Sequence, residues 1–215
     1  MNLTDTIAAI ATPPGEGGVG IVRLSGPEAE AIACRLFRSY AAISRLESHR
    51  LYYGTAFDSK EGEAIDACLM VVMRGPRSFT GEDTVEFQCH GGQLLLKRLL
   101  EALLRQGARF AGAGEFTRRA FLNGKIDLAQ AEAIAEVIKA KSDLALSVAN
   151  SQLRGRISRE VNGIKGRLLT LLSRVEAELD FPEEEDVDTS PPAEKVAEFE
   201  EIEARLMRLL ATYEE

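Results

Sequence analysis

Several residue types are scarce or missing in this sequence of 215 residues. It has no tryptophan, and aromatic residues make up only 6% of it against a hydrophobic fraction of 45%, so the core must be mainly aliphatic. Its two histidines, His49 and His90, stand in no H-E-x-x-H motif, and no C-x-x-C motif is present. We therefore expect no metal site. No apolar run approaches the roughly 20 residues that span a bilayer, so we expect no membrane segment.

The three cysteines, Cys34, Cys68 and Cys89, are widely spaced and odd in number. They predict reduced thiols of a cytoplasmic protein rather than a disulfide framework. The first residues lack a basic region followed by an apolar stretch, and Asp5 is an early acid. We therefore expect neither a secretory signal nor a mitochondrial presequence.

The net charge of -8 is unevenly distributed along the chain. Residues 1–175 carry 23 Lys/Arg and 19 Asp/Glu, whereas residues 176–215 carry 3 and 15. An anionic ligand is therefore compatible with the first part of the chain. The acidic end favours a solvated face or a basic partner.

The first 125 residues predict an α+β domain. Strands are expected over residues 6–10, 19–24, 51–57, 65–73 and 84–89, and a helix over residues 93–105 that ends before Gly107. Ser25 and Glu28 have the spacing of a capping box, with Pro27 in the first turn, and predict a helix start. The mixed order of strands and helices favours α+β over a doubly wound sheet.

From Asp127 onward the sequence predicts antiparallel helices. Asp127 and Gln130 form a second capping box before an alanine-rich helical stripe. Apolar residues at steps of three and four then predict a long amphipathic helix with a coiled-coil-like seam; they are Ile157, Val161, Ile164, Leu168, Leu171, Val175 and Leu179. An acidic loop follows, and Ser190 and Pro191 begin a third helix with an apolar face that reaches Tyr213. The helical bundle looks incomplete, which suggests part of a longer protein.

Residues 15–20 match the G-x-G-x-x-G pattern of dinucleotide-binding folds. That motif should open a helix after a strand, but residues 21–24 here continue as a strand. A glycine-rich hairpin loop is the better interpretation. No G-x-x-x-x-G-K-[ST] motif occurs, so a phosphate-binding loop of that type is absent from this sequence.

The densest polar stretch, residues 79–92, contains a turn through Glu82 and then a strand bearing Glu86. Glu86 is either an ordinary solvent-facing carboxylate or a pocket carboxylate that accepts paired N–H donors from a heterocycle. Cys89 and His90 are adjacent on the strand, so their side chains point to opposite faces and cannot share a ligand.

Residues 114–125 predict a short helix that ends at Asn123 and Gly124. It carries Arg118, Arg119 and Lys125. These are either a solvated basic turn or, together with Arg23, a site for an anionic ligand.

Five stretches, residues 5–26, 78–83, 90–92, 114–133 and 180–184, closely resemble the tRNA-modification GTPase family called MnmE or TrmE. They occur in the family's order and spacing. Ala113 stands where the family usually has proline before the Gly-Glu-Phe motif. That departure concerns turn geometry rather than a ligand group.

The resemblance implies an N-terminal folate-binding, aminomethyltransferase-like domain over residues 1–122, which forms a homodimer. A helical domain follows over residues 123–215, with a Ras-like GTPase domain expected after residue 215. Family members act with the flavoprotein MnmG (GidA) and add a one-carbon-derived, aminomethyl-type group to carbon 5 of the wobble uridine of tRNA. GTP, magnesium and potassium would belong to the GTPase domain, so residues 1–215 alone should not hydrolyse GTP, and no catalytic residue is expected among them.

The resemblance also assigns folate contacts to Arg23, Glu86 and Lys125. The ligand would be 5-formyl- or 5,10-methylene-tetrahydrofolate. A pterin has adjacent N–H donors that one carboxylate can accept, and the tail carboxylates of folate would attract Arg and Lys. The alternative is a non-catalytic dimerisation and helical scaffold whose folate pocket is vestigial.

Overall fold

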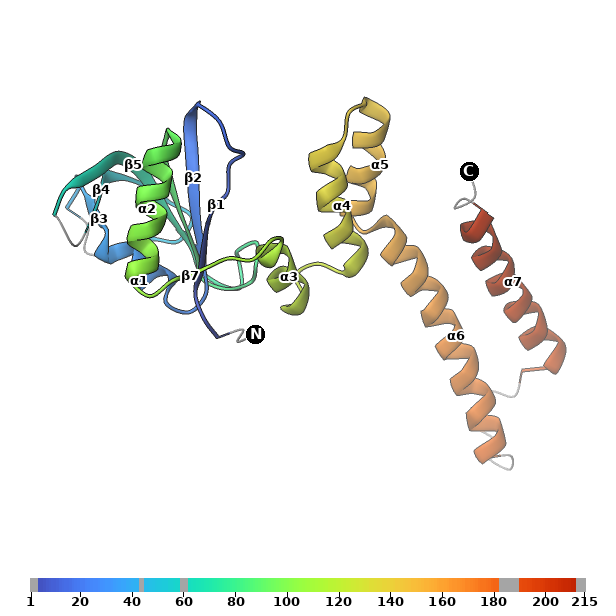
Figure 1. Cartoon of the computed structure of the whole chain (residues 1–215). Helices are drawn as coiled ribbons and strands as arrows, with labels where there is room; N and C mark the ends of the chain where they lie inside the picture. The colour runs from blue at the N-terminus through green and yellow to red at the C-terminus, as the bar shows by residue number, and fades with distance from the viewer. Residues whose placement is uncertain (1–3, 43–44, 59–61, 182–189, 212–215) are drawn as a thin grey trace. The chain divides into compact units, whose positions relative to one another are not determined.

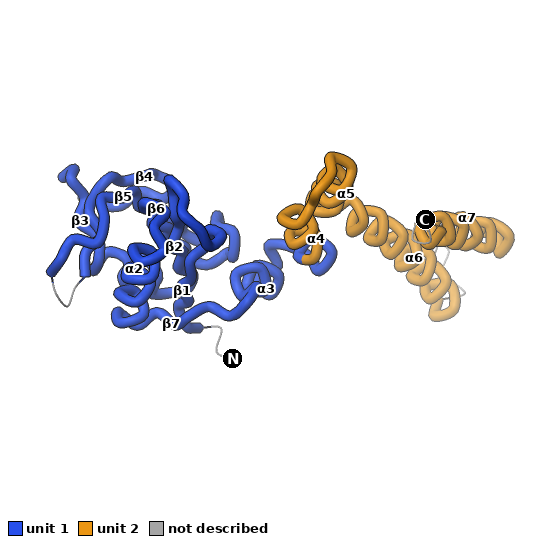
Figure 2. Tube along the Cα trace, turned by 45° about the horizontal axis from the view of Figure 1, so that its top comes forward, with its two compact units in different colours: residues 1–131 blue, residues 132–215 orange. Residues whose placement is uncertain are grey.

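The structure is a computed structural model that describes residues 4–42, 45–58, 62–181 and 190–211. It divides into two compact units, residues 1–131 and 132–215 (Figure 2). Unit 1 is α+β, and the described part of unit 2 consists of helices and short connections. The predicted fold class is confirmed.

Seven strands form one sheet in unit 1, in the order β3-β4-β5-β6-β2-β1-β7 (Figure 1). Neighbouring strands are antiparallel, except that β7 runs parallel to β1. All five predicted strands are present, and the two unpredicted ones, β3 and β7, are too short to carry an alternating pattern. The strands are β1 (Ile7–Ile10), β2 (Gly17–Ser25), β3 (Phe37–Ser39), β4 (Leu51–Phe57), β5 (Ala64–Met73), β6 (Thr84–Gly91) and β7 (Arg109–Phe110).

Helices α1 (Ala29–Arg35) and α2 (Gln93–Arg105) pack on one face of the sheet (Figure 1). The buried leucines of α2 (Leu96, Leu99, Leu100 and Leu103) and alternate residues of β2 and β6 belong to the core there. Gly20 on β2 allows this close packing, since a Cβ atom there would lie 2.5 Å from Cδ1 of Leu96. Because strand side chains alternate, the residues between the core positions face the other side of the sheet, where Arg23 and Glu86 lie.

Strands β1 and β2 form an antiparallel hairpin, and residues 15–20 run from its loop into β2. No helix follows the glycine motif. The hairpin interpretation is confirmed, and the dinucleotide-binding interpretation is excluded.

The capping box predicted at Ser25 and Glu28 is wrong. Ser25 is the last residue of β2, and its hydroxyl donates to Oε2 of Glu82 at 2.7 Å. Glu28 is the N-cap residue of α1, but its side chain caps nothing. Its backbone N–H donates instead to Oγ1 of Thr6 at 2.9 Å. A residue 22 positions away thus supplies the hydrogen bond that the local spacing suggested.

Unit 2 contains α5 (Asp143–Leu153), α6 (Arg156–Asp180), α7 (Pro192–Ala211) and most of α4 (Leu128–Lys139). The capping box before α4 is confirmed, because Gln130 N donates to Asp127 Oδ1 at 2.9 Å and Asp127 N donates to Gln130 Oε1 at 3.0 Å. The break between α4 and α5 was not predicted. Ser142 begins α5, and its hydroxyl accepts from the N–H of Ala145 at 3.2 Å.

Helices α6 and α7 run antiparallel, as predicted. Ion pairs Arg205–Glu160, Arg167–Glu201 and Arg174–Glu198 follow each other in opposite directions along the two helices. The seam predicted on α6 is buried only at Ile164 and Leu171, whereas Ile157, Val161, Leu168 and Leu179 are exposed. Tyr213 lies outside the described residues. Among the helices described, none is long and apolar enough to cross a membrane.

Candidate functional site

Arg23 and Glu86 form a cross-strand pair near the centre of the sheet. They are direct partners in the register of β2 and β6, and Nε of Arg23 donates to Oε1 of Glu86 at 2.7 Å. The side chain of Glu86 is only 13% exposed, and that of Arg23 is 30% exposed. Glu86 is therefore not an ordinary solvent-facing carboxylate.

The pair keeps unused hydrogen-bonding capacity. In the described part of the chain, the two terminal nitrogens of the Arg23 guanidinium donate no hydrogen bond. Oε2 of Glu86 accepts none there either. Beside them, the ring of Phe116 on α3 (Glu115–Leu122) lies 5.7 Å from Cζ of Arg23. The site thus offers a carboxylate acceptor, cationic donors and an aromatic ring.

Lys125 lies on a neighbouring loop. Its Nζ donates to the backbone oxygen of Pro76 at 2.8 Å. Its aliphatic stem packs closely on Gly81, since a Cβ atom added to Gly81 would lie 3.1 Å from Cγ of Lys125. The structure brings Arg23 and Glu86 into contact, and it records no contact of Lys125 with either of them within the described ranges.

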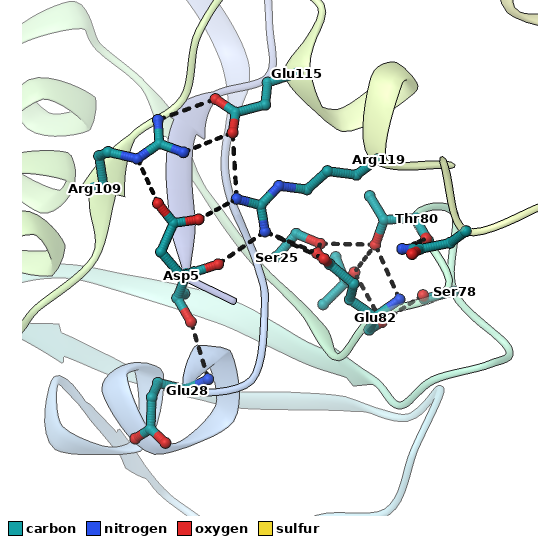
Figure 3. Close-up of polar contacts among 12 residues, drawn as sticks. Asp5, Ser25, Glu28, Ser78, Thr80, Glu82, Arg109, Glu115 and Arg119 are labelled. Carbon is teal, nitrogen blue, oxygen red and sulfur yellow. Dashed lines mark hydrogen bonds and ion pairs between the residues drawn. The ribbon is translucent and has the colours of Figure 1, made fainter. Parts of the chain in front are cut away.

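Arg119 is the centre of a buried polar network that the sequence did not reveal (Figure 3). Its side chain is 1% exposed. It donates to the backbone oxygen and carboxylate of Asp5, to both carboxylate oxygens of Glu82, and to Glu115. The two interpretations of residues 114–125 are therefore both wrong for Arg119, which is neither solvated nor available to an anionic ligand.

The second arginine of the network, Arg109, binds Asp5 and Glu115 from the other side (Figure 3). The pKa of Glu115 is lowered to about 2, chiefly by the hydrogen bond from Arg109 and also by that from the backbone N–H of Gly112. The pKa of Asp5 is also lowered, chiefly by the hydrogen bond from Arg109. Asp5 and Glu115 are therefore charged near neutral pH.

The network fixes α3 to the loop that precedes β6. Glu82 accepts from both Arg119 and Ser25, and Nδ2 of Asn123 donates to the backbone oxygen of Thr80 at 2.8 Å. The bond from Lys125 to Pro76 adds a third connection. The sequence signal available was the i, i+4 spacing of Glu115 and Arg119. The remaining partners are distant in sequence and could not be inferred from it.

Cys89 and His90 point apart, as predicted. Cys89 is buried, while the exposed imidazole of His90 contacts Oδ1 of Asp66 through Nδ1 at 2.8 Å. A hydrogen bond with Cys68 and burial both raise the pKa of the Cys89 thiol far above its usual value. Within the ranges described, no group of three or more His, Cys, Asp or Glu is placed to hold a metal ion.

Unit 2 contains a cavity of about 1060 Å³ beside α5, α6 and α7. Four arginines line it, with Ser, Gln and apolar residues between them. Two of the arginines are already paired with the Glu160 and Glu201 carboxylates on the same walls. No pattern in the sequence predicted this cavity.

Comparison with known families gives two adjacent matches. The model of the GTP-binding protein TrmE N-terminus matches residues 6–125, and the model of the MnmE helical domain matches residues 128–215. The chain belongs to the MnmE (TrmE) family. The resemblance seen in the sequence motifs is thereby confirmed.

Curated MnmE relatives are similar along almost the whole chain. The tRNA modification GTPase MnmE of Geobacter metallireducens is 49% identical over 215 residues, 100% of this chain and 47% of the relative. The Geobacter sulfurreducens protein of that name is 54% identical over 188 residues, 87% of this chain and 41% of the relative. The Moorella thermoacetica protein is 50% identical over 215 residues, which are 99% of this chain and 46% of the relative. The chain thus spans less than half the length of these MnmE relatives.

Proposed function

We propose that this chain is the folate-binding and helical part of a tRNA-modification GTPase. The whole protein, acting in the cytoplasm with the flavoprotein MnmG (GidA), would add a one-carbon-derived, aminomethyl-type group to carbon 5 of the wobble uridine. Residues 1–122 would bind 5-formyl- or 5,10-methylene-tetrahydrofolate and form a homodimer. Residues 123–215 would be the first part of the helical domain. Family membership and the relatives' names support this proposal.

The observation that carries the folate assignment is the contact between Arg23 and Glu86. A half-buried carboxylate with one free oxygen suits the adjacent N–H donors of a pterin. The guanidinium holds this carboxylate in place through Nε and retains donors for an anionic group. In this arrangement Glu86 binds the heterocycle, and Arg23 orients Glu86 while it meets the ligand.

Lys125 has a more distant part in the proposal. Its ammonium group is engaged by one carbonyl oxygen, that of Pro76, and an ammonium can donate three hydrogen bonds. It could therefore hold the loop and still attract the tail carboxylates of a folate.

The tetrahydrofolate supplies the one-carbon unit when it is bound. GTP, magnesium and potassium would act in a domain outside this chain. Pure residues 1–215 should therefore show no GTP hydrolysis in a phosphate-release assay with both metal ions present. GTP hydrolysis that stays with the chain through every purification step would contradict the placement of the GTPase activity outside residues 1–215.

One observation favours the scaffold alternative. Arg23 and Glu86 already neutralise each other, as they would in a pocket that has lost its ligand. Calorimetric titration of 5-formyl-tetrahydrofolate into the purified chain separates the two functions. Saturable binding at one site per chain supports the folate function. No heat and no thermal stabilisation at millimolar ligand would leave only the scaffold.

A further inference from the structure

Phe116 is a half-buried aromatic residue beside the Arg23–Glu86 pair, and neither the sequence motifs nor the resemblance assigned it a role. Its ring centroid lies 5.7 Å from Cζ of Arg23, within the range of a cation–π contact. Arg23 therefore has a cation–π contact with Phe116 and donates a hydrogen bond from Nε to Glu86. The benzene ring and the carboxylate flank one guanidinium.

The residues on either side of Phe116 are held firmly. Glu115 is 6% exposed and binds Arg109 and the N–H of Gly112. Arg119, one helical turn further, is bound by three carboxylates (Figure 3). The backbone of α3 is thus fixed by buried ion pairs, and the ring of Phe116 is presented from a rigid helix rather than from a loop. Such preorganisation is what a stacking surface needs.

We propose that Phe116 is a binding residue of this site and stacks against the fused ring of a pterin whose N–H edge meets Glu86. The inference rests on the proposed folate function and adds to it a recognition element for the flat heterocycle. An aromatic stacking contact of this kind is worth about 1.4 kcal/mol, equivalent to about tenfold in affinity. The affinity for p-aminobenzoyl-glutamate, the half of the ligand without the pterin ring, should not depend on this contact.

The chain offers a matched control on the same helix. Phe121 is 40% exposed and lies five residues further along α3, so it is turned about 140° away from Phe116. Phe116→Leu should weaken 5-formyl-tetrahydrofolate and a tail-less pterin about tenfold each, and should leave p-aminobenzoyl-glutamate unchanged. Phe121→Leu should bind all three ligands like the parent.

Because the sequence has no tryptophan, Phe116→Trp and Phe121→Trp each introduce a single fluorophore. Saturation with 5-formyl-tetrahydrofolate should quench and shift the emission of Phe116→Trp, with parent-like affinity, and should leave that of Phe121→Trp unchanged. If the parent binds the ligand but Phe116→Leu binds equally well and Phe116→Trp does not respond, Phe116 has no such role and the folate function stands. If the parent binds none of the ligands, the folate function and this inference fall together.

Discussion

Nε of Arg23 on β2 lies 2.7 Å from Oε1 of Glu86 on β6, across a directly paired position of the sheet. The resemblance assigned both residues to the same ligand without placing them in contact. The contact means that the two cannot act independently, because removing the arginine changes the charge environment and orientation of the carboxylate.

This coupling separates the expected effects of two substitutions. Lys125→Ala should weaken 5-formyl-tetrahydrofolate more than a tail-less pterin, because its ammonium would meet only the tail. Arg23→Ala should weaken both ligands, since it also releases Glu86. Each loss should be about ten- to a hundredfold, the value of a hydrogen bond to a charged group. Calorimetric titration of the two ligands into each variant measures the pattern, and an equal loss for both ligands in Lys125→Ala would contradict the tail assignment.

The buried arginine should contribute strongly to stability. Arg119→Met keeps the volume of the side chain but leaves Asp5, Glu82 and Glu115 without their shared cation. Breaking a buried ion pair costs about 3–5 kcal/mol. The adjacent Arg118→Met is the control, because Arg118 is exposed and exposed charges contribute about 0–1 kcal/mol. Urea unfolding followed by circular dichroism would measure both, and equal midpoints would show that the network is not stabilising.

Acid should weaken unit 1 through Glu115. The pKa of Glu115 is about 2 in the folded chain against 4.5 for the free group. Its folded pKa is the lower one, so its contribution is complete above about pH 5 and is lost as the pH falls toward 2. The loss amounts to about 3 kcal/mol.

Denaturant unfolding of the parent and of Glu115→Gln at several pH values tests this acid dependence. The variant should be less stable at pH 7 and should lose less free energy of unfolding between pH 5 and pH 2. Parallel pH profiles for the two proteins would show that Glu115 is not the responsible group.

The homodimer proposed for unit 1 has a candidate surface on the open face of the sheet. Leu51 and Tyr53 alternate with buried Tyr52 on β4, and they are 51% and 57% exposed. The ring of Tyr40 packs against that of Tyr53 in a tilted arrangement, with ring centroids 4.9 Å apart. Leu51→Glu should reduce a dimer to monomers in sedimentation equilibrium at tens of micromolar, a range set by micromolar affinity. A monomeric parent at that concentration would count against the dimer itself.

Local patterns sufficed where partners are close in sequence. The capping box of Asp127 and Gln130, the hairpin around the glycine motif and the long helix α6 were all predicted, because each depends on neighbouring residues. Ser25 shows the limit of this reasoning. Its spacing to Glu28 predicted a helix cap, but its hydroxyl instead forms hydrogen bonds with Glu82 and Thr80, which are distant in sequence.

The candidate site likewise has a part that could be predicted from the sequence and a part that could not. Arg23 and Glu86 came from the resemblance, and strand alternation placed Glu86 on a face without showing its partner. The network of Arg119 could not be predicted, since it joins residues up to 114 positions apart. A basic residue in a turn looks the same in sequence whether its charge is solvated or buried.

The most direct test of the folate site is the affinity of Glu86→Gln for 5-formyl-tetrahydrofolate. Glu82→Gln cannot serve as its control, because Glu82 accepts from Arg119 and Ser25. Glu101→Gln can, because Glu101 is 49% exposed on α2 and its contact with Lys97 spans 3.9 Å. Calorimetry should show Glu86→Gln weakened about ten- to a hundredfold and Glu101→Gln unchanged, with identical circular dichroism. If a folded Glu86→Gln variant binds the ligand as tightly as the parent, Glu86 does not bind folate and the site assignment is wrong.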